Sequence, residues 1–290
     1  MYDSLKEICE KEKESGLLFW QLVRKEDAQD QGVTEHAVTE QMTQMYHAMK
    51  DSDNHYEEDR KSTSGLVGTD GAKIRERREK GEMLCGDFIG SVVERALRIA
   101  ESNACMKRIV AAPTAGSCGV LPAVLISIQE RFSLTDEKMV EAVFVAGGIG
   151  GVIANRAFIA GAEGGCQAEI GSASAMAAGA AAYLLGGNAE EISNASALAM
   201  KSMLGLACDP VAGLVEVPCV KRNVSGAVIA VTSADMTMAG VHSKIPADEV
   251  IDAMRSIGKH MDASIRETGQ GGLAATPTGE NVRRSMEQLF

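Results

Sequence analysis

A stretch of small residues constrains the fold of this chain more than any other feature of its sequence. Between Ala146 and Ala182, 22 of 37 residues are glycine or alanine. Small side chains allow helix backbones to approach one another closely, and a helix without a polar face is buried. The overlapping uncharged run 170–188 approaches the length of a membrane span, but its Gly, Ala and Ser residues are not hydrophobic enough for one. We therefore expect a buried helix of a globular protein in this region.

The charged residues are distributed unevenly along the 290 residues. Residues 1–108 hold 39 charged side chains, whereas residues 109–240 hold only 17. We predict one domain, 1–290, with a charged helical N-terminal section, 1–108, and a buried core, 109–290. The net charge of −11 argues against binding of nucleic acid, which requires a basic surface. Because the N-terminus lacks the apolar segment of a signal peptide, we expect a cytoplasmic protein that does not bind a membrane.

Helical periodicity dominates the remaining sequence. Apolar residues recur at steps of three and four in 38–49, 84–99 and 250–261, which is the spacing of one helix face. Alternating strand patterns are scarce, and only 109–112 and 215–220 are short candidates. We predict a mainly α fold, a single compact helical domain with glycine-rich loops and few or no short strands.

Several common catalytic motifs are absent. Residues 145–155 contain Gly148-x-Gly150 but lack the third glycine of a dinucleotide-binding loop, and no G-x-x-x-x-G-K-[ST] loop occurs. The hydrolase and protease signatures G-x-S-x-G and H-E-x-x-H are also missing. For each histidine taken singly, we favour a surface or capping role over catalysis. The five histidines are His36, His47, His55, His242 and His260.

The seven cysteines fall into two groups according to their neighbours. Cys9, Cys85 and Cys105 lie in or beside predicted helices, where we expect them to pack into the core. The other four are Cys118, Cys166, Cys208 and Cys219. Their glycine and proline neighbours fix the backbone and hence the direction of each thiol, which suits a metal or an iron–sulfur cluster. Spacing alone leaves metal binding open, because zinc sites usually contain close C-x-x-C pairs.

Five motifs, in order along the chain, carry a resemblance to a known family. They are KSTSGLVG (61–68), PTAGSCGVLP (113–122), GCQAEIG (165–171), LACDPVAGLVEVPCVKRN (206–223) and GLAATPTG (272–279). Through these motifs the chain resembles, over nearly its whole length, the α chain of the iron–sulfur-dependent bacterial L-serine dehydratase, or L-serine ammonia-lyase. The resemblance implies a carbon–oxygen lyase that converts L-serine to pyruvate and ammonia.

The resemblance also implies a cofactor and its ligands. In the family, the matching cysteines hold a [4Fe-4S] cluster, so the expected ligands here are Cys166, Cys208 and Cys219, within the core 109–290. Cys118 is then expected to be a bystander, at most lining the pocket. Three thiolates leave one iron without a protein sulfur, and that open iron can act as a Lewis acid on the hydroxyl of L-serine.

The substrate contacts and the general base are expected elsewhere in the sequence. Two loops offer hydroxyl and backbone N–H groups for the carboxylate of L-serine, although helix capping explains these residues equally well. The residues are Ser62, Thr63, Ser64 and Gly65 in one loop and Thr114, Gly116 and Ser117 in the other. His242 and His55 are candidates for the base, but neither lies in a motif. Because a β chain normally completes the enzyme in this family, we favour a base from that chain and expect a hetero-oligomer.

Two other functions are compatible with these motifs. A pyridoxal-phosphate dehydratase would catalyse the same net reaction through a lysine Schiff base, for which Lys61 or Lys73 could serve. A non-enzymatic iron–sulfur sensor or scaffold would need the cysteines but no substrate site. Iron and sulfide content distinguishes the pyridoxal-phosphate enzyme from a cluster enzyme. Turnover of L-serine distinguishes a sensor or scaffold from an enzyme.

Overall fold

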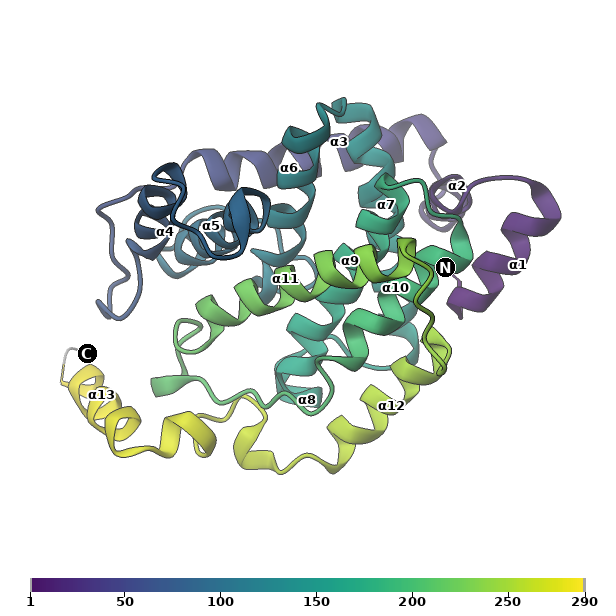
Figure 1. The fold of residues 1–290 in the computed structure, drawn as a ribbon. Coiled ribbons are helices and arrows are strands. Elements are labelled where there is room, and N and C mark those ends of the chain that lie inside the picture. Colours follow the sequence, from purple (N-terminus) through teal and green to yellow (C-terminus); the bar gives the residue numbers. More distant parts are fainter. Residues whose placement is uncertain (1, 289–290) are drawn as a thin grey trace.

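The alanine-rich segment forms the central helix of the molecule, as its composition predicts. Helix α9 (Ser172–Leu184) is buried from its first residue to Tyr183. It packs against α7 (Asp136–Arg156), α10 (Ala189–Lys201) and α11 (Cys219–Met238), and these helices surround it in Figure 1. Because its side chains are small on every side, the neighbours approach closely: a Cβ added to Gly179 would lie 2.8 Å from Ser196 Oγ.

The computed structural model describes residues 2–288, and thirteen α-helices make up most of this part of the chain. The remaining helices are α1 (Leu5–Ser15), α2 (Phe19–Gln31), α3 (Glu35–Asn54), α4 (Asp70–Glu79), α5 (Gly86–Ala104), α6 (Val120–Phe132), α8 (Gly161–Gly164), α12 (Ala247–His260) and α13 (Pro277–Glu287). The prediction of a mainly α, single compact helical domain is confirmed.

Helices α1 to α3 cover one side of the core. The predicted apolar face in 38–49 belongs to α3, whose first turn is capped by Thr34: its hydroxyl accepts a hydrogen bond from the backbone N–H of Ala37 at 3.2 Å. Both α2 and α3 pack against α7. Phe19 and Tyr46 are fully buried there, and the Tyr46 hydroxyl donates to Gln129 Oε1 at 2.6 Å.

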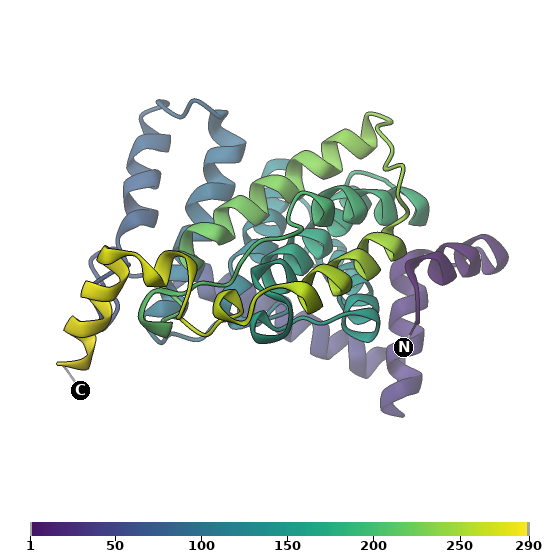
Figure 2. The ribbon, with the colours of Figure 1, turned by 90° about the horizontal axis from the view of Figure 1, so that it is seen from below.

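Helices α4 and α5 form a hairpin that projects from the body of the molecule in Figure 2. The buried carboxylate of Glu94 joins them: it accepts hydrogen bonds from Arg75 at 3.0 Å, from Arg78 at 2.9 Å and from Arg98 at 3.1 Å. The expected helix face from Leu84 to Ile99 is wrong at its start. Because α5 begins only at Gly86, Leu84 lies in the turn between the two helices and is fully exposed.

Three further expectations need correction. Cys85 lies in the same turn and is exposed, so it does not pack into the core. No strand occurs among residues 2–288: 109–112 is irregular, and 215–220 consists of a turn followed by the start of α11. These short apolar runs have no partner strand with which to pair. A single bridge joins Cys208 to Arg266, where Cys208 N–H donates to Ile265 O at 2.8 Å.

The C-terminal helices lie along one side of the core, beneath α9 and α10 in the view of Figure 1. The predicted apolar face in 250–261 is confirmed for α12, in which Val250 and Met254 are buried, although Met261 follows the end of the helix. None of the described helices combines the length and the apolar character that crossing a membrane requires.

Candidate functional site

Two cysteines meet at one buried centre, and a third from another segment lies near them. Cys166 lies between the short helix α8 and a π-helical segment, Cys208 follows α10 in an extended segment, and Cys219 is the first residue of α11. The thiols of Cys166 and Cys208 lie within 4.8 Å of one another and of a carboxylate oxygen of Glu169. Cys219 is close enough to interact electrostatically with both thiols. The structure therefore brings together the three cysteines that the resemblance named.

Glycine residues leave the space that this centre requires. Gly165, directly before Cys166, has a φ of 75°, which a residue with a side chain rarely adopts. A Cβ added to Gly161 would lie 3.0 Å from Cys208 Sγ and 2.8 Å from a carboxylate oxygen of Glu169. The π-helical segment Gln167–Gly171 follows at once, and such segments are frequent at functional sites.

The three thiols differ in their electrostatic surroundings. A hydrogen bond with Cys208 lowers the pKa of Cys166 in spite of burial, and the positive charge of Arg222 acts in the same direction. The same hydrogen bond, together with burial, raises the pKa of Cys208. Burial raises the pKa of Cys219 to about 12. Three thiolates together would thus need a strong positive charge beside them, which a metal centre provides.

The donor set fits a metal cluster. All three thiols are buried and none forms a disulfide. Thiolates are soft donors, which select iron–sulfur clusters, zinc or copper over magnesium and calcium. Arg222 donates to Asp209 at 2.8 Å and to Ala207 O at 2.6 Å, so its cation is fixed beside the thiols. These residues are compatible with a buried metal cluster.

Glu169 is a buried carboxyl group at the centre that the sequence analysis missed. The Thr114 hydroxyl donates to it at 2.7 Å, and its other oxygen lies 3.8 Å from Cys208 Sγ. Burial raises the pKa of Glu169, although the Thr114 bond opposes this shift. The residue belongs to the GCQAEIG motif, so its motif could have identified it.

The loop 113–119, here called the Thr114 loop, is tied to the start of α11 by Asn223. The buried amide of Asn223 donates to Gly116 O at 2.8 Å and to Cys219 O at 3.0 Å, and its oxygen accepts from Gly119 N–H at 2.8 Å. Ser117 is buried beneath the loop, where its hydroxyl lies 3.3 Å from Thr114 O. The predicted contacts Thr114, Gly116 and Ser117 therefore lie next to the cysteines.

The loop 62–68, here called the Ser62 loop, reaches the same region through Glu216. The Ser62 hydroxyl donates to a carboxylate oxygen of Glu216 at 2.8 Å, and the Ser64 hydroxyl donates to the same oxygen. Glu216 lies three residues before Cys219 and was not predicted from the sequence. Between the two serines, the side chain of Thr63 is exposed, and Gly65 takes the left-handed conformation that the turn requires.

Four residues considered in the sequence analysis lie apart from the cysteines or make other contacts. His242 follows the end of α11 that is opposite Cys219, about 30 Å away along a 20-residue helix. His55 is exposed at the end of α3, where its ring contacts Asp51 O. The Cys118 thiol is fully buried and contacts Ile99 O at 3.9 Å. Lys73 is exposed and pairs with Asp70 at 2.7 Å.

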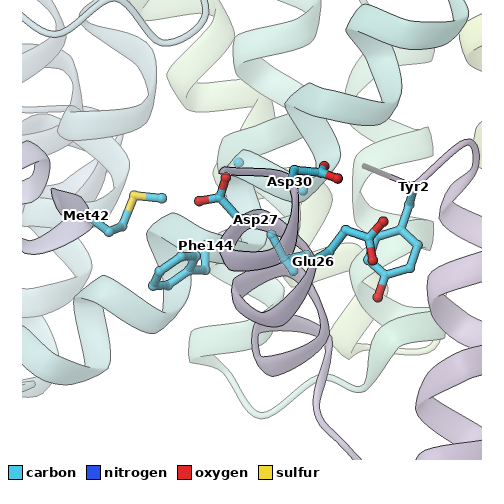
Figure 3. A pocket seen from close by; sticks show the side chains of 9 residues that line it. Tyr2, Glu26, Asp27, Asp30, Met42 and Phe144 are labelled. Carbon is cyan, nitrogen blue, oxygen red and sulfur yellow. The ribbon is translucent and has the colours of Figure 1, made fainter. Parts of the chain in front are cut away.

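A separate pocket of about 180 Å³ contains none of the predicted site residues. Residues of α2, α3 and α7 line it together with Tyr2, and Figure 3 shows Glu26 beside Tyr2 and Asp27 facing Met42. The lining combines these acidic side chains with apolar ones such as Phe144. The residues that line this pocket include no cysteine, so the pocket is separate from the cysteine centre.

Comparisons with known proteins agree with this geometry. A family model described as "Serine dehydratase alpha chain" matches residues 14–274. The chain is 45% identical over 286 residues to the probable L-serine dehydratase α chain of Bacillus subtilis (strain 168), which covers 99% of this chain and 95% of that one. It is 39% identical over 294 residues to the L-serine dehydratase α chain of Peptoniphilus asaccharolyticus, covering 98% of each chain.

A longer relative matches in part. The chain is 45% identical over 181 residues to the L-serine dehydratase TdcG of Escherichia coli (strain K12), which covers 62% of this chain but 40% of that protein. The family match and the two full-length relatives cover almost all of the sequence, and the range of the family match contains Cys166, Cys208 and Cys219. The chain belongs to the serine dehydratase α-chain family.

Proposed function

We propose that this chain is the α subunit of an L-serine dehydratase, a lyase that converts L-serine to pyruvate and ammonia. One observation carries the proposal: Cys166, Cys208 and Cys219 converge beside two donor-rich loops in a chain of this family. The full-length relatives, which carry the name L-serine dehydratase α chain, support the same activity. We further propose that it works in the cytoplasm, where thiols stay reduced.

We assign Cys166, Cys208 and Cys219 as the ligands of a [4Fe-4S] cluster. When bound, such a cluster supplies one iron without a protein thiolate, and its Lewis acidity makes the hydroxyl of L-serine a better leaving group. The contribution of this chain is to hold the thiolates in fixed directions in a buried place. Arg222, held by Asp209, contributes a positive charge that favours the thiolate form of Cys166.

The two loops are assigned to the substrate carboxylate. The Thr114 loop leads into α6, and the Ser62 loop lies against the start of α11, which Cys219 opens. Helix N-termini favour anions because their first N–H groups have no partner within the helix. The two loops contribute seven residues to the proposed substrate-binding region, and these are Ser62, Thr63, Ser64, Gly65, Thr114, Gly116 and Ser117.

The base that removes the Cα proton is assigned to a second chain. His242 follows the far end of α11 and His55 is exposed, so neither supports a role beside the cysteines. The longer relative extends well beyond the part that this chain matches, which is consistent with a further unit in the complete enzyme. We therefore propose a β chain as the partner, in a hetero-oligomer with this one.

The two alternative functions have weaker support. A Schiff-base lysine requires a desolvated surrounding that lowers its pKa, whereas Lys61 is exposed and the side chain of Lys73 is 70% exposed and paired with Asp70. A sensor or scaffold would not need the hydroxyl-bearing loops that lie beside the cysteines.

Anaerobic purification with the β chain tests the proposal. We expect about four irons and four sulfides per α chain, together with conversion of L-serine to equal amounts of pyruvate and ammonia. An intact cluster without turnover would contradict the dehydratase assignment and favour a sensor. Activity of iron-free protein that carries a chromophore fixed to the chain by borohydride reduction would favour pyridoxal phosphate instead.

A further inference from the structure

Glu216 is a buried carboxylate whose hydrogen bonds are all directed to the Ser62 loop. Its side chain is 7% exposed, and one of its oxygens accepts from both Ser62 and Ser64. Each serine hydroxyl has a single hydrogen, and both hydroxyls donate it to this oxygen. The loop and the segment before Cys219, which are 154 residues apart, are therefore joined at one atom.

One more contact holds the Ser62 loop against the same segment. Val67 and Val220 are both buried in a small apolar cluster with Leu97. The Glu216 carbonyl accepts a hydrogen bond from Val220 N–H at 3.0 Å, so the backbone of Glu216 belongs to the start of α11. The position of the loop relative to Cys219 thus depends on contacts with residues 216–220.

The far end of the loop is also fixed. The buried carboxylate of Glu101 accepts hydrogen bonds from the N–H groups of Asp70 at 2.9 Å and Gly71 at 3.1 Å, in the first turn of α4. One buried carboxylate therefore lies at each end of the loop, and of these two Glu216 is the one that connects the loop to the segment before Cys219.

The bond to Glu216 decides which groups of the loop remain for a substrate. The hydroxyl hydrogens of Ser62 and Ser64 are used, and Gly65 N–H donates to Ser62 O at 2.9 Å. Within residues 2–288, the hydroxyl of Thr63 and the backbone N–H groups of Thr63 and Ser64 donate no hydrogen bond. These three donors can bind a carboxylate without breaking any contact of the loop.

We propose that Glu216 is a positioning residue for the reaction. It holds the Ser62 loop beside Cys219 so that Thr63 and the backbone N–H groups of Thr63 and Ser64, rather than the serine hydroxyls, bind the carboxylate of L-serine. The identity of the substrate in this proposal rests on the proposed function. The fixed position of the loop does not depend on that function.

Steady-state kinetics of matched variants test the role in binding. In anaerobically purified α plus β with unchanged iron and sulfide content, Glu216→Ala should raise KM for L-serine about tenfold and change kcat less than about twofold. Glu216→Gln should restore KM to near the unsubstituted value, because its amide oxygen still accepts both hydroxyl bonds. Glu141→Ala is the control: it removes a carboxylate that accepts a hydroxyl bond from Tyr183, in helix α7.

The serine hydroxyls provide a second test. The double variant Ser62→Ala with Ser64→Ala should raise KM by the same factor as Glu216→Ala, and combining all three changes should add little. A further rise of KM in the combined variant would show that the hydroxyls bind the substrate directly and would overturn the proposal. A lower KM in Glu216→Ala would also overturn it, since the carboxylate would then be occupying the place of the substrate.

Limited proteolysis tests the position of the loop without any substrate. Trypsin cleaves after Arg60 and Lys61, both exposed and directly before the loop. Glu216→Ala should increase cleavage there severalfold, and Glu216→Gln and Glu141→Ala should not; equal cleavage in all four proteins would overturn the proposal. Lack of L-serine turnover by the unsubstituted complex would instead contradict the proposed function, and the two failures can therefore be told apart.

Discussion

Buried carboxyl groups connect the segments of the candidate site, and each receives bonds from residues far away in the sequence. Glu169 accepts a bond from Thr114, which lies 55 residues before it, and Glu216 accepts one from Ser62. A buried carboxylate without such partners would be unstable, because desolvation penalises its charge. The carboxylates therefore make the loops and the cysteine segments depend on each other.

The three assigned ligands lead to the first prediction. Replacing Cys166, Cys208 or Cys219 singly by serine should remove most of the bound iron and sulfide, because serine lacks the soft thiolate that such clusters require. Iron and sulfide analysis with the visible absorption spectrum measures this loss. Cys85→Ser is the control, since this thiol is exposed in the α4–α5 turn and should have no effect. Full iron content in all three variants would show that the ligands are misassigned.

The amide of Asn223 leads to a second prediction. Asn223→Ala leaves the buried Gly119 N–H and the carbonyl of Gly116 without their partner, so the free energy of unfolding should fall by about 1–3 kcal/mol. Urea denaturation followed by circular dichroism measures it. Asn103→Ala removes an exposed bond to Ala115 O of the same loop and should have a much smaller effect. Equal losses in the two variants would contradict the importance of burial.

At the scale of secondary-structure elements, periodicity predicted the helices better than their ends. The apolar steps in 38–49 and 250–261 identified α3 and α12, because one face of each helix packs on the core. The start of α5 was missed at Leu84, since an apolar residue in a turn fits the same spacing. The cysteines were found through motifs. Glu216 and Asn223 lie in the same motif as Cys208 and Cys219, but their roles were not predicted, because contacts with distant loops leave no local pattern.

Adjacent glycines in α7 provide a matched test of helix packing. Gly147 is exposed, and the nearest atom to an added Cβ there is Met42 Cε at 3.9 Å, whereas a Cβ on Gly148 would lie 2.4 Å from a Val23 methyl group and 3.1 Å from Phe19. Gly147→Ala should raise the free energy of unfolding by about 0.5–1 kcal/mol, because alanine restricts the unfolded chain.

The substitution at the neighbouring glycine should have the opposite effect on the free energy of unfolding. Gly148→Ala should lower the free energy of unfolding by about 1–3 kcal/mol, since α2 must move away from α7. Thermal and urea unfolding of both variants measure the difference. Stabilisation by both substitutions would mean that α2 adjusts without cost and that α7 and α2 do not need this close approach.

For the whole molecule, the charge network of the α4–α5 hairpin predicts how stability depends on pH. Burial alone would raise the pKa of Glu94, but hydrogen bonds from Arg75 and Arg78 outweigh it and the pKa is lowered. The unfolded chain therefore binds the proton first as pH falls. The stabilisation from Glu94 is complete above the unfolded pKa of about 4.3 and is lost as the pH falls through the folded pKa.

A single substitution tests this dependence. Glu94→Gln should lower the free energy of unfolding at neutral pH by about 3 kcal/mol, since the half-buried guanidinium partners lose their buried carboxylate. It should also flatten the loss of stability between about pH 5 and pH 3, measured by urea denaturation across a pH series. Glu76→Gln, in an exposed pair with Lys80, should leave both quantities unchanged. If Glu94→Gln loses as much stability between about pH 5 and pH 3 as the unsubstituted protein, other groups cause that loss.

The backbone bridge at Cys208 has a consequence for the order of events during synthesis. Cys208 N–H donates to Ile265 O at 2.8 Å, and Glu267 N–H donates to Cys208 O at 2.7 Å. Leu273 N–H donates to the neighbouring Asp209 at 2.8 Å. Ribosomes build chains from the N-terminus, so Cys166 and Cys219 emerge before the residues that fix Cys208. A nascent chain that has not reached residue 267 has all three thiols but not their final arrangement, so a metal that needs all three would be bound late in maturation.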